Sequence, residues 1–311
     1  MEILLELSFI MDKRKEGVAL FITLMVIASM MTIITVSFSY LDKARKDAGT
    51  TSVIIQGDLL YKNTTAVLKR FFPQGRDNSE KLKLIYTAPL MLSEPKSHFN
   101  LSLSCTPLLT GVPINWLDEK LAWKMAEREH LAQETLTKVM EEYNLEEPNQ
   151  LEELILREIT GKISQNEDYQ PRIQQLKGII SKRQFDRVIM NYYLLYDDPK
   201  ALAVPWEKYF SFGAVDAKTQ IDGVYLTAEF ISVAFDIPLE IVRDSWIVGE
   251  STLMTFLKEN AIITPMNKIY SSKPLNAMHC EQSYAYQKGQ YKFNFNYIKG
   301  RSSNFEFNGK E

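Results

Sequence analysis

The stretch from Val18 to Phe38, VALFITLMVIASMMTIITVSF, decides how this chain is built. It runs for about 21 residues without a charged side chain, and as a helix rising about 1.5 Å per residue it can cross a hydrocarbon core of roughly 30 Å. A helix buried in a soluble core would normally carry polar residues along one face. The stretch therefore predicts a single transmembrane helix, with the rest of the chain folded outside the membrane.

The charges around this span predict its orientation. The segment Lys13-Arg-Lys15 lies directly before it, and basic residues collect on the cytoplasmic side of membrane spans. A second basic group at 43–46 reduces the asymmetry, although Asp42 and Asp47 partly offset it. We therefore expect a cytoplasmic N-terminus. The 311-residue chain has a net charge of −3, so it lacks the basic footprint of a nucleic-acid-binding protein.

A processing signal lies at the start of the span, where Lys13-Arg-Lys-Glu-Gly17 ends in glycine directly before Val18. This arrangement resembles the leader of type IV pilins and of the pseudopilins of type II secretion. In that family the prepilin peptidase, a membrane-embedded aspartyl peptidase, cuts after the glycine and the new N-terminus is methylated. The resemblance implies cleavage between Gly17 and Val18, with Met11 as a candidate true start. The alternative is an uncleaved signal anchor with a chance glycine.

Ile22 would be the fifth residue of the mature chain. Major pilins and most pseudopilins carry a glutamate there, which can neutralise the terminal amine of a neighbouring subunit inside the membrane. The K-type minor pseudopilin of type II secretion lacks this carboxylate, and Ile22 resembles it in that respect. The resemblance implies an assembly role for Ile22 in a subunit at the tip of the filament.

The remaining sequence predicts a long helix followed by a mixed domain. Apolar residues recur every three or four positions from Val53 to Phe71, which continues the N-terminal helix unless 49–52 interrupts it. Alternation of polar and apolar residues predicts strands at 81–86, 99–105, 290–297 and 304–307. Helical spacing between these strands predicts helices at 115–144, 149–162, 171–196, 227–235 and 239–248.

Because the late strands must return to pair with the early ones, the fold class expected is α+β. It comprises a long N-terminal transmembrane helix and a pilin-like antiparallel sheet that carries a large all-helical insertion. The expected parts are a cytoplasmic leader at 1–17, the transmembrane and long N-terminal helix at 18–72, the first part of the α+β domain at 73–111, the helical insertion at 112–262, and the returning C-terminal strands at 263–311.

Two short segments strengthen the resemblance to the K-type family. In these proteins Ile-Asn segments flank the helical insertion, and Ile114-Asn115 stands where the first is expected. The second corresponds to 220–231, in which Asp222 and Tyr225 replace the usual asparagines. Members of the family can bind calcium, which makes Asp216 and Asp222 conceivable ligands by resemblance only. No calcium-loop pattern supports them, and no cofactor is required.

Known catalytic patterns are missing from the sequence. The three histidines His98, His130 and His279 have no metal-ligand spacing, and neither a nucleophile elbow nor a phosphate-binding glycine loop occurs. We therefore expect no catalytic residue and no enzyme activity. In an oxidising periplasm, Cys105 and Cys280 are candidates for a disulfide that joins the early and late strands, and two buried free thiols are the alternative.

The resulting hypothesis is a structural minor pseudopilin, at the tip of a type II secretion pseudopilus, that acts in protein export by assembly. Its expected partners are other minor pseudopilins, the major pseudopilin, the prepilin peptidase and the bacterial inner membrane, with the main domain in the periplasm. One alternative is a minor pilin of a type IV pilus or of a DNA-uptake pseudopilus. Another is a signal-anchored periplasmic enzyme with an unrecognised site.

Overall fold

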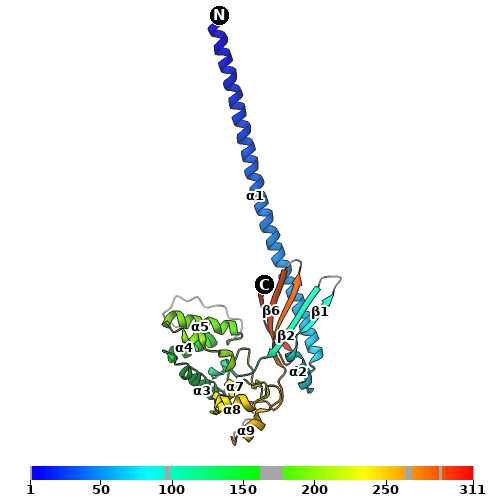
Figure 1. The fold of residues 1–311 in the computed structure, drawn as a ribbon, viewed down its shortest axis with the longest axis vertical. Helices are drawn as coiled ribbons and strands as arrows, with labels where there is room; N and C mark the ends of the chain where they lie inside the picture. The colour runs from blue at the N-terminus through cyan, green and yellow to red at the C-terminus, as the bar shows by residue number, and fades with distance from the viewer. Residues whose placement is uncertain (1, 95–98, 162–177, 263–267, 287–288, 311) are drawn as a thin grey trace. The chain divides into compact units, whose positions relative to one another are not determined.

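The computed structural model describes residues 2–94, 99–161, 178–262, 268–286 and 289–310 (Figure 1). At some helix and strand positions, chiefly 2–24, it describes the backbone alone. The chain divides into two compact units, Met1–Leu60 and Tyr61–Glu311. Each unit is described by itself.

The N-terminal helix α1 runs from Glu2 to Phe71 and contains the whole segment predicted as helix. It begins before the expected start at Val18, because residues 2–17 also have helical backbone. The stretch at 49–52 does not break it. It ends where Pro73 and the left-handed Gly75, with φ +76°, cannot continue a helix. Within the described residues, no helix combines the length and the apolar character that crossing a membrane requires. The side chains at 18–24, in the first part of the predicted span, lie outside the described residues.

An antiparallel sheet of five strands forms the centre of the second unit, in the order β1-β2-β5-β6-β7. Its strands are β1 (Leu90–Glu94), β2 (Phe99–Pro107), β5 (Ala277–Tyr286), β6 (Gly289–Ile298) and β7 (Arg301–Lys310). The pairing of β2 with β5 joins the early strands to the late ones, as expected for an α+β fold. Figure 1 shows the helical insertion between them in the sequence as a separate lobe beside the sheet.

The last turns of α1 cover one face of this sheet. The ring of Tyr61 lies 5.3 Å from that of Phe295 and 4.9 Å from that of Phe305, and its hydroxyl donates to Ser302 Oγ at 2.9 Å. Leu68 near the end of α1 and Phe72 directly after it are also buried. These aromatic contacts stabilise the sheet against the helix end.

The strand predicted at 81–86 is wrong, because these residues form the helix α2 (Ser79–Thr87). The alternating pattern would bury Leu82, Leu84 and Tyr86 together. The structure instead buries Leu82 and Ile85, which are three positions apart, and exposes Leu84. A segment this short fits both the two-residue period of a strand and the 3.6-residue period of a helix. Packing of the face that carries Leu82 and Ile85 decides for the helix.

The helical insertion contains seven α-helices within the described residues, and they share one large apolar core. They are α3 (Ala126–Glu142), α4 (Pro148–Thr160), α5 (Lys182–Tyr196), α7 (Ala228–Phe235), α8 (Leu239–Ser245) and α9 (Leu253–Glu259), with a single turn α6 (Lys200–Ala203) as well. Ser181, Thr227 and Thr252 cap α5, α7 and α9 through their side-chain oxygens. The insertion is not all-helical, because β3 (Val112–Pro113) pairs in parallel with β4 (Phe210–Ser211).

Helix α3 begins later than the predicted position 115. Residues Ile114–Leu117 form a 3-10 turn in which all four side chains are buried, so there is no solvent-facing side of an amphipathic helix. Trp123 and Lys124 then adopt φ values of 58° and 55°, which lie outside the right-handed helical region. The continuous helix can therefore begin only after them.

Candidate functional site

The predicted cleavage point lies within α1. Gly17, Val18 and Ile22 all have helical backbone, and their side chains lie outside the described residues. The roles of these three residues in processing and assembly therefore stay predictions.

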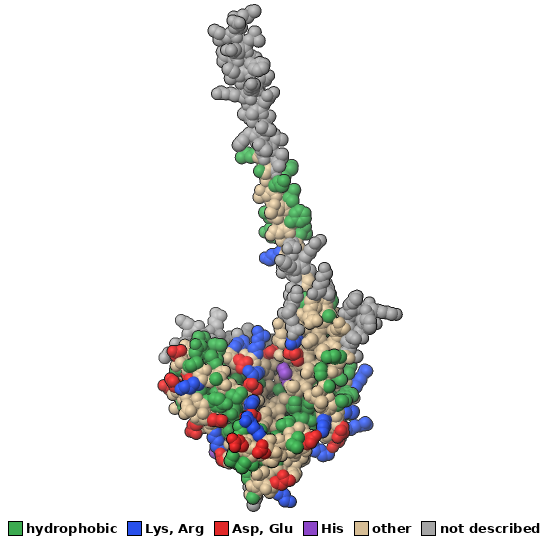
Figure 2. Space-filling model, viewed as in Figure 1, with side chains coloured by type: hydrophobic (Ala, Val, Ile, Leu, Met, Phe, Trp, Pro, Cys, Tyr) green, Lys and Arg blue, Asp and Glu red, His purple; other side chains and the backbone are tan. Residues whose placement is uncertain are grey.

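The described side chains between Met25 and Leu41 form an apolar surface around α1. Met31, Ile33 and Phe38 are exposed by 64%, 66% and 67%. Figure 2 shows hydrophobic side chains gathered along this part of the helix, with no acidic side chain among them. An exposed apolar surface of this extent needs lipid or protein around it.

The hydroxyl groups on this segment are satisfied by the helix itself. The hydroxyls of Ser29, Thr32, Thr35 and Ser37 each donate to the carbonyl oxygen four residues earlier, at 2.8 Å. A hydroxyl that is already bonded costs much less to place in an apolar medium than a free one. The polar residues of the span are therefore compatible with a nonpolar surrounding.

The two cysteines lie opposite each other on neighbouring strands. Cys105 of β2 and Cys280 of β5 are register partners and are joined by a disulfide in the structure. Both side chains are buried. The bond links the strand before the helical insertion to the strand after it, 175 residues later.

Asn115 holds together three segments at the base of the helical insertion. Its amide Nδ2 donates to the carbonyl oxygens of Ile179 at 2.8 Å and Gly213 at 2.9 Å, and its Oδ1 accepts from Ile179 N at 2.7 Å. The side chain is 1% exposed. Gly178 packs against it, with φ +96° and no room for a Cβ beside Asn115. The resemblance predicted the position of Asn115 but not its partners, for which the sequence offers no signal.

Asp222 also links separate segments of the chain through hydrogen bonds. Its Oδ1 accepts from Val224 N at 2.9 Å and Tyr225 N at 3.2 Å, its Oδ2 accepts from Leu275 N at 2.7 Å, and its own N–H donates to Leu109 O. Asp222 therefore contacts the chain entering the helical insertion through its backbone N–H, and the chain leaving the insertion through its carboxyl. Burial raises the pKa of Asp222 to about 6, and the three backbone hydrogen bonds oppose that rise.

The candidate calcium ligands Asp216 and Asp222 accept hydrogen bonds in the structure, and calcium binding stays a prediction. Both oxygens of Asp222 are used by backbone donors, while Asp216 Oδ1 accepts from Lys218 N and from the Thr219 hydroxyl. The buried guanidinium of Arg128 donates to Thr219 O at 2.7 Å and places a positive charge at this loop. Among the described residues, no group of three or more His, Cys, Asp or Glu side chains could hold a metal ion.

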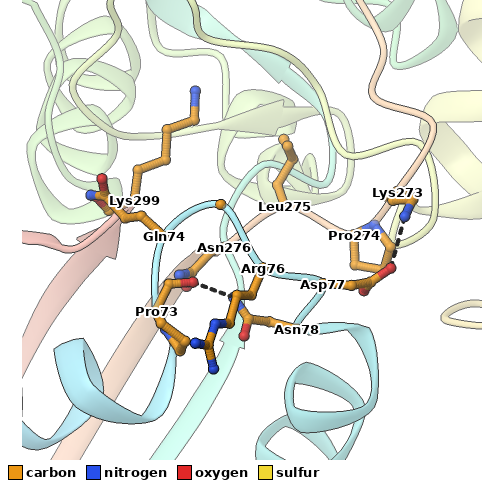
Figure 3. A pocket seen from close by; sticks show the side chains of 11 residues that line it. Pro73, Gln74, Arg76, Asp77, Asn78, Lys273, Pro274, Leu275, Asn276 and Lys299 are labelled. Atoms are coloured by element: carbon orange, nitrogen blue, oxygen red, sulfur yellow. Dashed lines mark hydrogen bonds and ion pairs between the residues drawn. The ribbon is translucent and has the colours of Figure 1, made fainter.

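The histidines are likewise separated. His279 Nδ1 contacts Asn296 Oδ1 at 2.8 Å, His130 is an exposed neighbour of Glu134, and His98 lies outside the described residues. A pocket of about 360 Å³ lies between the turn after α1 and the segment before β5 (Figure 3). At its edge Lys273 pairs with Asp77 at 2.8 Å, and this contact raises the pKa of the Lys273 ammonium, so the amine stays protonated. The residues that line the pocket include no Ser, Thr, Cys, Tyr or His.

Comparison with solved structures identifies a similar fold. No known protein-family model and no curated protein matches the chain. Among solved structures, a chain in the crystal structure of the GspK-GspI-GspJ complex from the type 2 secretion system of enterotoxigenic Escherichia coli matches with a TM-score of 0.50. The match covers 83% of this chain and 98% of that chain at 10% sequence identity. At this identity the likeness shows the fold alone.

Proposed function

We propose that this chain is a K-type minor pseudopilin of a type II secretion system, which acts by assembly rather than by catalysis. The observation that carries the proposal is the combination of an uncharged apolar helix directly after Gly17 with an α+β unit whose sheet is interrupted by a helical insertion. The fold likeness to a chain of a minor pseudopilin complex supports the same assignment.

In this role α1 anchors the chain in the bacterial inner membrane and packs beside the helices of sister pseudopilins. The apolar surface from Met25 to Leu41 and its internally bonded hydroxyls suit both surroundings. The second unit faces the periplasm, an oxidising compartment in which the Cys105–Cys280 disulfide persists. Ile22 brings no carboxylate to a subunit above it, so the subunit belongs at the filament tip.

The proposal is tested at the N-terminus of the mature protein. Mass spectrometry of the protein from its native host should give a chain that begins at Val18 and carries an N-methyl group. Gly17→Val should accumulate as the uncut precursor, because a branched Cβ hinders the extended backbone that a protease cleft requires.

Gly49→Val is the matched control. It makes the same change in the same helix, where an added Cβ would meet no atom within 4 Å. Its product should begin at Val18 like the wild type. Recovery of native protein that starts at Met1 or Met11 would contradict the proposal.

A further inference from the structure

Helix α5 carries a second face of large apolar side chains, which the described residues leave exposed. Its inner face is buried in the core of the helical insertion through Phe185, Ile189 and Tyr192, which are at most 2% exposed. On the outer face, Met190, Leu194 and Leu195 are exposed by 45%, 71% and 65%. Three large apolar side chains at the end of one short helix form a patch of the kind that marks an interaction surface.

The outer face has the spacing of a helix-packing seam. Arg183, Arg187, Met190 and Leu194 follow one another at intervals of four, three and four residues. At about 100° per residue they fall within an arc of about 60° around the helix axis. The same alternation of three and four positions places side chains of one helix between those of another. We call these four residues the α5 stripe.

The positive charge of the α5 stripe indicates which kind of partner can bind it. Arg183 and Arg187 are exposed, and neither guanidinium makes a hydrogen bond or an ion pair with any described residue. The neighbouring Lys182, by contrast, pairs with Asp186 at 2.8 Å. The stripe therefore presents two positive charges, without a partner in the part of the chain that the structure describes, in its first half and two apolar side chains in its second half.

We propose that the α5 stripe binds an amphipathic helix of a partner protein, with acidic residues that meet Arg183 and Arg187 and apolar residues that pack on Met190 and Leu194. A helix fits better than a membrane surface. A surface-bound helix needs an apolar face along its whole length with basic residues at its flanks, whereas here charge and apolar surface follow one another along one narrow line. The inference does not depend on the pseudopilin role.

The test uses the full-length chain in lipid nanodiscs and a synthetic probe peptide. The probe is a peptide with capped ends and helix-forming residues. It carries two glutamates four positions apart, then a leucine three positions after the second glutamate and another leucine four positions after the first leucine. Fluorescence anisotropy should detect binding, and a peptide of the same composition with scrambled order should bind at least about tenfold more weakly.

Charge reversal gives the decisive comparison. Arg183→Glu combined with Arg187→Glu should abolish binding of the acidic probe and allow binding of a probe with lysines in place of its glutamates. Leu194→Asp should weaken binding of the acidic probe to the wild-type stripe, and binding of the lysine probe to the charge-reversed stripe. The double variant Arg76→Glu with Arg301→Glu reverses two exposed arginines elsewhere and should leave binding of the acidic probe unchanged.

All substituted side chains are exposed, so the variants should melt with the wild type in circular dichroism, which separates loss of binding from loss of fold. Equal binding of the ordered and scrambled probes would overturn the proposal. Failure of the charge reversal to exchange probe preference would do the same. Two other results would also overturn the proposal, because they would assign the stripe to another occupant. The first is self-association of the chain that is lost in the Leu194→Asp variant. The second is binding to vesicles of anionic lipid that is lost in the same variant.

Discussion

Replacement of Asn115 by alanine should strongly destabilise the helical insertion. The change removes three hydrogen bonds and leaves three buried backbone groups without their partner, namely Ile179 N–H, Ile179 C=O and Gly213 C=O. Each unsatisfied buried group costs about 1–2 kcal/mol, so the free energy of unfolding should fall by roughly 3–6 kcal/mol.

Asn115→Asp separates hydrogen bonding from side-chain size. Aspartate retains an acceptor for Ile179 N, but its second oxygen faces the two carbonyl oxygens to which the amide donates. This repulsion, together with a buried charge, should make the aspartate variant less stable than the alanine variant at neutral pH. At acid pH the protonated carboxyl can donate to one of these carbonyls, so part of the loss should be recovered.

Urea unfolding of the full-length chain, followed by tryptophan fluorescence and circular dichroism, measures these changes. The alanine variant should unfold at a lower urea midpoint with an unchanged slope. Asn191→Ala is the control, since Asn191 is exposed on α5 and alanine favours helices, so its midpoint should stay near that of the wild type. An alanine variant as stable as the wild type, or an aspartate variant more stable than it at neutral pH, would refute the structural role given to Asn115.

Three further outcomes are expected. Ile22→Glu should weaken complementation of secretion at matched membrane levels, because an unpaired carboxyl in the membrane costs roughly 3 kcal/mol; equal or improved function would exclude the tip position. Replacing Cys105 and Cys280 together by alanine should lower stability by about 5 kcal/mol in the chain-entropy model, and two reactive thiols in the unreduced, denatured wild type would rule out the bond. Because burial raises the pKa of Asp222 from 3.8 to about 6, stability should fall by about 3 kcal/mol as pH rises from about 4 to above 6, and Asp222→Asn should remove this slope in pH-dependent urea unfolding.

The sequence predictions were accurate where an element is set by residues close together in the chain, and failed where packing against distant residues sets it. The strands at 99–105 and 290–297 lie within β2 and β6, and the start of the helix at Pro148 was predicted within one residue, because their patterns and start signals are local. β5 was missed. Its inward side chains alternate as Met278, Cys280, Gln282 and Tyr284, and the fully buried glutamine disguises the apolar side of the strand.

The sequence by itself determined the apolar character of the stretch at 18–38, because hydropathy needs no tertiary contact. It also indicated an α+β domain in which late strands return to early ones. Only the tertiary structure decided that Cys105 lies opposite Cys280, and that Asn115 binds backbone groups 64 and 98 residues away. Partners so distant in sequence are brought together by packing of the whole unit, and no local period or propensity encodes which buried carbonyl an amide will meet.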